Sequence, residues 1–82
     1  MELILSKNAE KEYKKLPKSD QKKVYRKLLI IEKNPTDGKK LLGQLAGVYS
    51  ARVWPYRILF QINDKEKRVE VLKIAHRQSV YR

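Results

Sequence analysis

An alternating apolar pattern, interrupted once by proline, constrains the fold of this chain more than any other feature. Apolar residues occupy every second position from Tyr49 to Val53 and again from Tyr56 to Ile62. This period of two is typical of strands that bury one face and expose the other. Trp54-Pro55 separates the two runs, so the sequence predicts an antiparallel hairpin that turns at this dipeptide.

A two-residue turn at this dipeptide also fixes the register of the hairpin. Arg52 then lies opposite Arg57, and Tyr49 lies opposite Phe60. One face, which helices are expected to cover, carries Tyr49, Ala51, Val53, Tyr56, Ile58 and Phe60. The other face carries Ser50, Arg52, Trp54, Arg57, Leu59 and Gln61. Directly opposed guanidinium groups repel, and no Asp or Glu occurs from Gly43 to Ile62, so the uncovered face favours an external anion.

A short strand and two helices are expected before the hairpin. Residues 2–5 form the apolar run of the strand, and Ser6 can cap a first helix that stops at Pro17. The second helix has an apolar stripe at helical spacing, with Ser19 or Asp20 as its cap. It is expected to end near residue 33, because Pro35 biases the preceding residue away from helical geometry.

The segments that flank the hairpin complete the predicted order of elements. Glycines punctuate residues 36–47, so this stretch, which carries Lys39 and Lys40, is expected to be a loop. A polar turn at residues 63–66 leads to a last strand over residues 68–75, with apolar residues on both faces. The order β-α-α-β-β-β predicts an α+β domain over residues 1–82, with two helices on one face of a mainly antiparallel sheet.

The net charge of +11 on 82 residues favours a polyanionic partner, which is a nucleic acid, an acidic protein or an anionic membrane surface. There is no cysteine, so neither a disulfide framework nor a thiolate metal site is expected. The longest apolar run, residues 28–31, is far shorter than the roughly 20 residues that cross a bilayer. No apolar signal stretch begins the chain, so membrane insertion is not expected and a cytoplasmic location fits.

Residues near the carboxyl end add chemistry to the sheet edge. His76, Arg77 and Tyr81 follow the last strand, and arginine is well suited to phosphate because its planar fork binds two oxygens. Tyr81 or Trp54 can stack on a splayed RNA base. His76 is the only histidine in the sequence, and histidine is the residue type best suited to proton transfer near neutral pH, which makes it a candidate acid or base, although strand alternation places it on the other face from Arg77.

The segment from Gly47 to Phe60, followed by His76 to Tyr81, closely resembles the core pattern of RelE-type toxins of the RelE/ParE toxin–antitoxin superfamily. Upstream features that also fit are residues 9–16, Pro17-Lys18, Gln21, the Asn34-Pro35 break and the connector of residues 38–45. The resemblance therefore covers essentially the whole chain. It depends on the ordered set of motifs, since no single motif is diagnostic.

The resemblance implies the toxin of a type II toxin–antitoxin system, a ribosome-dependent endoribonuclease that cleaves messenger RNA in the A site. Its partners would be the ribosome, the message and an acidic antitoxin that forms a hetero-oligomer with it. By position, the resemblance assigns catalytic roles to Arg52, Arg57, Arg77 and Tyr81. Ser50 stands where some relatives carry a second lysine.

The expected reaction needs no metal and no cofactor, because a 2′-hydroxyl attacks the adjacent phosphate and leaves a cyclic phosphate and a 5′-hydroxyl. Arg57 and Arg77 would stabilise developing charge, Arg52 would position the phosphate, and Tyr81 would stack or transfer a proton. Lys39, Lys40 and Trp54 are the expected further RNA-binding residues. Two alternatives remain: a ParE-like toxin that inhibits DNA gyrase without cleaving anything, and a catalytically decayed basic module that only binds RNA or the antitoxin.

Overall fold

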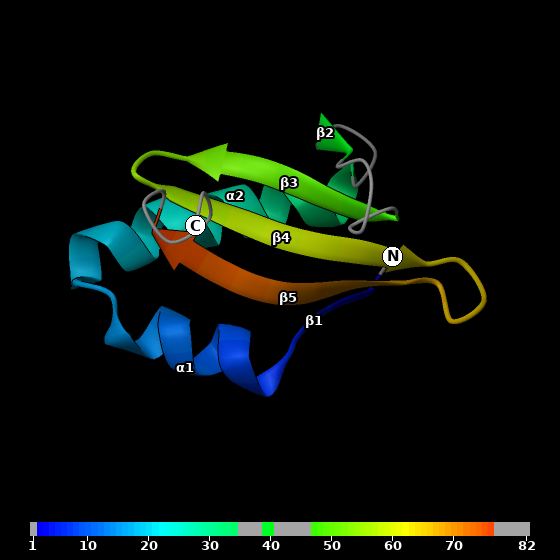
Figure 1. Ribbon diagram of the computed structural model, residues 1–82, viewed down its shortest axis with the longest axis horizontal. Helices are drawn as coiled ribbons and strands as arrows, with labels where there is room; N and C mark the ends of the chain where they lie inside the picture. Colours follow the sequence, from blue (N-terminus) through cyan, green and yellow to red (C-terminus); the bar gives the residue numbers. More distant parts are fainter. Residues whose placement is uncertain (1, 35–38, 41–46, 77–82) are drawn as a thin grey trace.

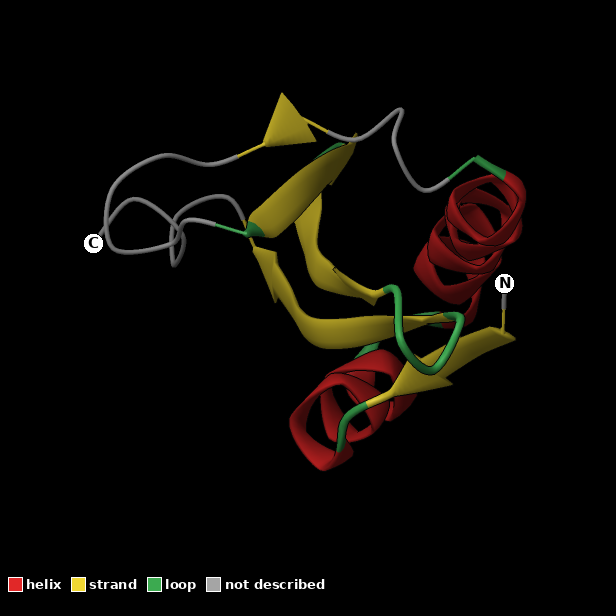
Figure 2. Cartoon of the chain, turned by 90° about the vertical axis from the view of Figure 1, so that its right-hand side faces the viewer, coloured by secondary structure: helices red, strands yellow, loops and turns green. Residues whose placement is uncertain are grey.

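The computed structural model describes residues 2–34, 39–40 and 47–76 of the chain. Its elements are β1 (Glu2–Leu5), α1 (Lys7–Lys15), α2 (Lys18–Lys33), β2 (Lys39–Lys40), β3 (Val48–Val53), β4 (Tyr56–Asn63) and β5 (Arg68–His76). The strands form one sheet in the order β1-β5-β4-β3-β2, and β1 runs parallel to β5 while the other pairs are antiparallel (Figure 1). Both helices contribute to the same core against the sheet, with α2 behind β3 and β4 and α1 along the edge of β5 (Figure 1, Figure 2). The predicted α+β arrangement is confirmed.

The β3–β4 hairpin has the predicted register. Arg52 pairs with Arg57 and Tyr49 pairs with Phe60, and the turn consists of Trp54 and Pro55, joined by a cis peptide bond. The Tyr49 and Phe60 rings stack at 5.6 Å between centroids on the face that the helices cover. Phe60 and Ile58 are fully buried there, together with apolar residues of both helices. The separation of faces expected from alternation is therefore present.

Ser6 links β1 to α1 and to the neighbouring strand. Its Oγ accepts a hydrogen bond from the backbone N–H of Ala9 at 3.1 Å, which confirms the predicted cap of α1. The same hydroxyl donates to the backbone carbonyl of Leu72 in β5 at 2.9 Å. At the other end of α1, the side-chain amide of Gln21 donates to the carbonyls of Tyr13 and Leu16, and the Tyr13 carbonyl also accepts from the backbone N–H of Leu16.

The start of α2 differs from the prediction. Pro17 is the N-cap, and neither Ser19 nor Asp20 caps the helix, because both lie inside its first turn. Proline fits this position because its ring fixes φ near the value observed, −56°. The carboxylate of Asp20, placed favourably near the positive end of the helix, instead accepts a hydrogen bond from the Tyr56 hydroxyl at 2.7 Å. The helix ends at Lys33, as predicted.

Strand β5 contains a bulge that alternation alone did not reveal. Leu59 pairs with Lys73 whereas Phe60 pairs with Val71, so Leu72 is an extra residue in β5. The extra residue reverses the alternation, and Val71 and Ile74 both belong to the buried core. The sequence showed apolar residues at positions expected to lie on both faces of this strand. The bulge explains part of this pattern, because it brings residues from both sets of positions to the buried face.

The outer edge of the sheet also differs from the prediction. Lys39 and Lys40, expected in a loop, form the two-residue strand β2, whose backbone pairs with Ser50 and Tyr49 of β3. Pairing with β2 covers part of an edge of β3 that would otherwise expose backbone N–H and C=O groups. Among the described segments, no helix is long and apolar enough to cross a membrane.

Candidate functional site

The face of the sheet opposite the helices holds the candidate site in three neighbouring strands. Because cross-strand partners share a face, Arg52, Arg57 and Ala75 form one row across β3, β4 and β5. Ser50, Leu59 and Lys73 form the next row, farther from the hairpin turn. Cations from all three strands therefore lie in two adjacent rows.

Arg57 is held by a serine in the next row. Its Nη1 donates a hydrogen bond to the Oγ of Ser50 at 3.1 Å. The two residues are diagonal neighbours across β3 and β4, a spacing of about 7–8 Å that a long side chain bridges. Ser50 is only 3% exposed, so the hydroxyl that holds the guanidinium is shielded from water. The bond orients Arg57 away from the hairpin turn.

Arg52 extends in the opposite direction. Its guanidinium carbon lies 5.6 Å from the centre of the Trp54 ring, a cation–π contact beside the turn. Trp54 is 54% exposed, so its ring remains accessible at the surface. The repulsion expected between two opposed arginines is reduced because one side chain turns toward the tryptophan and the other toward the serine.

Glu70 lies farther along the strands on this face, and its carboxylate already accepts hydrogen bonds from two side chains. Glu70 pairs with Gln61, four residues along β4 from Arg57, which corresponds to about 13 Å. Gln61 donates to Glu70 at 2.8 Å and Arg68 donates at 3.1 Å. These contacts, first that of Gln61 and then that of Arg68, lower the pKa of Glu70. At that distance the charge of Glu70 is largely screened from Arg57.

His76 lies on the other side of the sheet. It pairs with Tyr56, and its ring meets the Tyr56 ring edge-on at 5.7 Å. Tyr56 donates to Asp20, and this hydrogen bond raises the pKa of the phenol. The register therefore separates the imidazole from the face that carries Arg57, in agreement with the parity expected from the sequence.

The structure brings together only part of the predicted set. Arg52, Arg57 and Trp54 share one face, whereas Arg77 and Tyr81 lie outside the described residues. Lys39 and Lys40 are described as the backbone of β2, next to β3. Within the described segments, no three His, Asp or Glu side chains gather closely enough to hold a metal ion.

Two participants were not singled out by sequence reasoning. Ser50 was placed on the uncovered face and noted as a departure from relatives, but it was given no role, although it accepts a hydrogen bond from Arg57. Lys73 was not considered, although it shares the site's face. The signal for Ser50 was present in the hairpin register, since it lies diagonal to Arg57. Lys73 could not be assigned to this face because the bulge at Leu72 alters the alternation.

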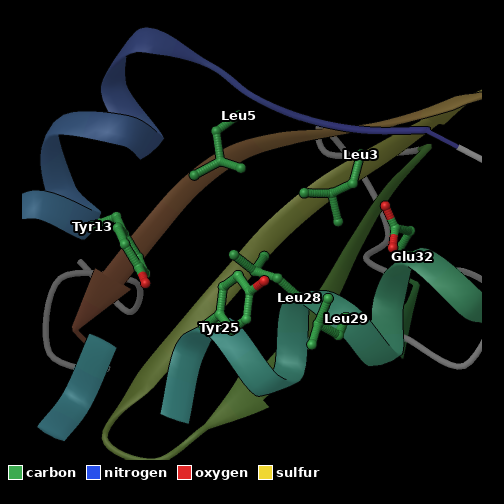
Figure 3. Close-up of a pocket in the computed structure, with 7 residues that line it drawn as sticks. All are labelled: Leu3, Leu5, Tyr13, Tyr25, Leu28, Leu29 and Glu32. Atoms are coloured by element: carbon green, nitrogen blue, oxygen red, sulfur yellow. The ribbon is translucent and has the colours of Figure 1, made fainter. Parts of the chain in front are cut away.

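A second surface lies on the helical side of the molecule. Side chains from β1, α1 and α2 line an apolar groove of about 360 Å³ between the two helices (Figure 3). Its lining consists of Leu3, Leu5, Tyr13, Tyr25, Leu28, Leu29 and Glu32. An adjoining depression shares Tyr13 and Tyr25 and adds Lys18 and Lys22. The groove thus combines apolar walls with a basic border.

The amino-acid sequence matches one protein family along almost the full chain. The family described as the ParE toxin of the type II toxin–antitoxin system, parDE, matches residues 3–81. The chain belongs to this family. It is a RelE-type toxin of the RelE/ParE superfamily, as its resemblance indicated.

Relatives with known structures share the RelE fold. A chain of the toxin–antitoxin complex RelBE2 from Mycobacterium tuberculosis is 30% identical and has a TM-score of 0.84, with 92% of this chain and 95% of that chain covered. A chain of the RelBE complex from E. coli has a TM-score of 0.80 at 22% identity, over 92% of this chain and 94% of that one. The second similarity shows the fold alone.

Curated relatives match over a shorter stretch. Toxin RelG of Mycobacterium tuberculosis is 44% identical over 45 residues, which cover 55% of this chain and 52% of RelG. Toxin RelE of the same organism is also 44% identical over 45 residues, covering 55% of this chain and 46% of that toxin. The matched stretch therefore spans about half the length of these relatives.

Proposed function

We propose that this toxin is a ribosome-dependent endoribonuclease that cleaves messenger RNA in the A site, in the cytoplasm. The observation that carries the proposal is the arginine pair of the β3–β4 hairpin, Arg52 and Arg57, which lie opposite each other across the two strands on the face that carries Ser50. A phosphodiester in the course of cleavage gains negative charge, and positioned guanidinium groups stabilise it. Exposed Trp54 beside Arg52 offers a surface on which an RNA base can stack.

The proposed reaction is an attack by the 2′-hydroxyl on the adjacent phosphate. The bond to the 5′-oxygen breaks, and the products carry a 2′,3′-cyclic phosphate and a 5′-hydroxyl. Arg57 stabilises charge on the phosphate, Arg52 positions it, and Arg77 and Tyr81 supply a further cation and a stacking or proton-transferring group. His76 contributes less readily, because its ring packs against Tyr56 on the helical side.

Primer extension on a translated message tests the proposal directly. The purified toxin is expected to produce discrete cuts when ribosomes are present and none on the same message without them. A toxin that cuts equally well without ribosomes would contradict ribosome dependence. Complete absence of cutting under both conditions would contradict the nuclease assignment.

A message whose vulnerable nucleotide carries a 2′-methoxy group tests the chemistry at constant magnesium. The methylated oxygen has no proton to lose and cannot attack, while the phosphate contacts remain available. Cleavage at that nucleotide is expected to stop, while cleavage of the unmodified control message continues. Persistent cutting at the blocked nucleotide would exclude the mechanism even for a protein that is a nuclease.

The name of the matched family favours one rival function. The matched family is named for the ParE toxin, and a toxin of the ParE kind would inhibit DNA gyrase and cleave no RNA. A supercoiling assay with purified gyrase separates the two functions. Gyrase inhibition without message cleavage would select the rival, whereas cleavage without gyrase inhibition would select the nuclease. A module that binds RNA or an antitoxin without either activity would be the catalytically decayed form.

An acidic antitoxin is the proposed partner, in a toxin–antitoxin hetero-oligomer. Several structural relatives are toxin–antitoxin complexes, including RelBE2 from Mycobacterium tuberculosis. In this chain, the groove between the helices exposes Tyr25 and Leu29 beside Lys18 and Lys22. Those apolar walls with a basic border suit an amphipathic antitoxin segment with acidic side chains at its margin.

A further inference from the structure

A polar hollow beside the candidate site gathers unpaired lysines from two elements. It measures about 320 Å³ and lies between α1 and β5. Its lining consists of Asn8, Lys11, Glu12, Lys15 and Lys73. The four residues from α1 have the spacing of one helical face, and Lys73 extends from the strand that this helix borders.

The charges in the hollow are mostly uncompensated. Lys11, Lys15 and Lys73 form no ion pair within the described part of the chain, whereas Lys14, elsewhere on α1, pairs with Glu10. The one carboxylate in the lining, that of Glu12, accepts a hydrogen bond from the backbone N–H of Ile74 at 2.9 Å. Glu12 is thus fixed to the strand edge, and three ammonium groups face one carboxylate.

Lys73 connects the hollow with the face that carries the arginines. It pairs with Leu59, two residues along β4 from Arg57. Lys73 and Arg57 are therefore diagonal neighbours, at about 7–8 Å between their Cα atoms. An RNA strand with one phosphate at Arg57 would bring nearby backbone to this edge of the sheet.

We propose that the hollow formed by Lys11, Lys15 and Lys73 binds a backbone phosphate of RNA beside the phosphate held by the arginines. Asn8 adds a side-chain amide that donates hydrogen bonds to phosphate oxygens. Lysine binds phosphate as a point charge without base preference, so this contact adds affinity and position and no sequence specificity. The inference rests on the proposed function, because it takes RNA as the ligand.

Binding of an uncleavable RNA tests the site. The probe is a single-stranded RNA with 2′-methoxy groups throughout, and its affinity for the full-length toxin is measured over a series of salt concentrations. The variant combines Lys11→Gln, Lys15→Gln and Lys73→Gln. Its matched control combines Lys23→Gln, Lys33→Gln and Lys65→Gln, which removes the same charge from exposed lysines outside the hollow.

The hollow variant is expected to bind at least about tenfold more weakly than the control variant at 0.1 M salt, and with a salt dependence shallower by about 0.7 in logarithmic slope, the value for one phosphate on a single strand. Ribosome co-sedimentation without message is the second arm. Loss in the RNA arm assigns the phosphate to the message, and loss only with ribosomes assigns it to ribosomal RNA. Equal behaviour of hollow and control variants in both arms would overturn the proposal, as would a loss confined to antitoxin binding.

Message cleavage by the unmodified toxin, measured beside RNA binding by the variants, distinguishes a failure of the hollow site from a failure of the proposed nuclease function. If the toxin cuts messages but the hollow and control variants bind both the RNA probe and ribosomes equally, the hollow site is wrong and the nuclease stands. If the toxin cuts nothing yet the hollow variant loses RNA binding selectively, the nuclease is wrong and the hollow stands. Urea unfolding of both variants verifies that neither triple substitution has altered the fold.

Discussion

Ser50 shows how one small side chain organises the candidate site. A lysine at this position would add a fourth cation to a face that already carries Arg52, Arg57 and Lys73. The serine hydroxyl instead accepts a hydrogen bond from Arg57 in a position shielded from water. A bond to a charged group contributes about 1.5–3 kcal/mol, enough to hold one orientation of a flexible side chain.

Ser50→Ala is expected to lower the rate of message cleavage about tenfold, with little change in the substrate concentration at half-maximal rate, because Arg57 loses its orientation. Ser50→Thr keeps the hydroxyl and is expected to restore most of the rate. In an Arg57→Ala background, Ser50→Ala should have no further effect, since the residue acts through that arginine. Additive losses in the double variant would show that Ser50 does not act by positioning Arg57.

Arg57→Ala and Arg77→Ala are each expected to abolish toxicity and slow cleavage at least about a hundredfold, which corresponds to roughly 3 kcal/mol of transition-state stabilisation. Neither change should unfold the protein: Arg57 lies on the face without helices, and Arg77 lies beyond β5 in the sequence. Growth after induced expression measures toxicity, and primer extension measures cleavage. Near-normal cleavage by either purified variant would contradict the assignment of that arginine.

At the scale of elements, α1 completes the edge of β5 beyond the end of β1. Parallel pairing of β1 covers β5 from Arg68 to Val71. Past that point Ser6 donates to the carbonyl of Leu72, and the Glu12 carboxylate accepts from the N–H of Ile74. The helix thus takes over from the strand as hydrogen-bond partner, which fixes the edge that borders the polar hollow.

Glu12→Ala is expected to destabilise the fold by about 1–3 kcal/mol, because it leaves the N–H of buried Ile74 without its acceptor. Glu10→Ala is the matched control on the same helix. Glu10 pairs only with exposed Lys14, so its loss should cost about 0.5 kcal/mol or less. Urea unfolding measures both; equal changes would show that the Glu12 contact contributes no more than a surface pair.

The contacts of Gln61 and Arg68 with Glu70 are expected to stabilise the fold at neutral pH and to lose this stabilising effect in acid. The pKa of Glu70 is lowered in the fold, so its contribution is present above the ordinary carboxyl pKa of about 4.3 and is lost as the pH falls through the lowered value. Glu70→Gln should therefore lose less stability than the unmodified toxin between pH 6 and pH 3. Glu66→Gln, in the exposed turn, should follow the unmodified toxin; an identical acid response of all three would contradict the prediction.

The sequence predicted the elements whose pattern is local and failed where a distant partner decides. Alternation around Trp54-Pro55 was sufficient for the register that pairs Arg52 with Arg57. The bulge at Leu72 was not predicted, because an extra residue in a strand is recognised only from its pairing with the partner strand. For the same reason, the face on which Lys73 lies could not be predicted. The cap of α2 was misassigned because Asp20 has a tertiary partner, Tyr56, that no local signal indicates.

At the scale of the whole molecule, the excess of positive charge is distributed over several distinct surfaces of the described residues. The sheet face carries the arginine pair, the edge at β5 carries the lysine hollow, and Lys18 and Lys22 border the apolar groove on the helical side. Because the chain has a net charge of +11, the proposed acidic antitoxin would be attracted over the whole surface before it makes specific contacts. Its apolar residues can then pack in the groove.

Because charge is spread over the surface while the groove is apolar, salt is expected to affect the association rate of the antitoxin, and a substitution in the groove is expected to affect its dissociation rate. The association rate of the purified pair should fall by about tenfold or more as salt rises from low concentration to 0.5 M, because ions screen the long-range attraction. Leu29→Asp, which places a carboxylate in the groove, should instead raise the dissociation rate and leave that salt dependence in place. Ile30→Asp, also on α2 and exposed but outside the groove lining, is the matched control and should change neither rate strongly. Surface plasmon resonance measures both rates, and an association rate indifferent to salt would show that apolar contact, without electrostatic attraction, governs the encounter.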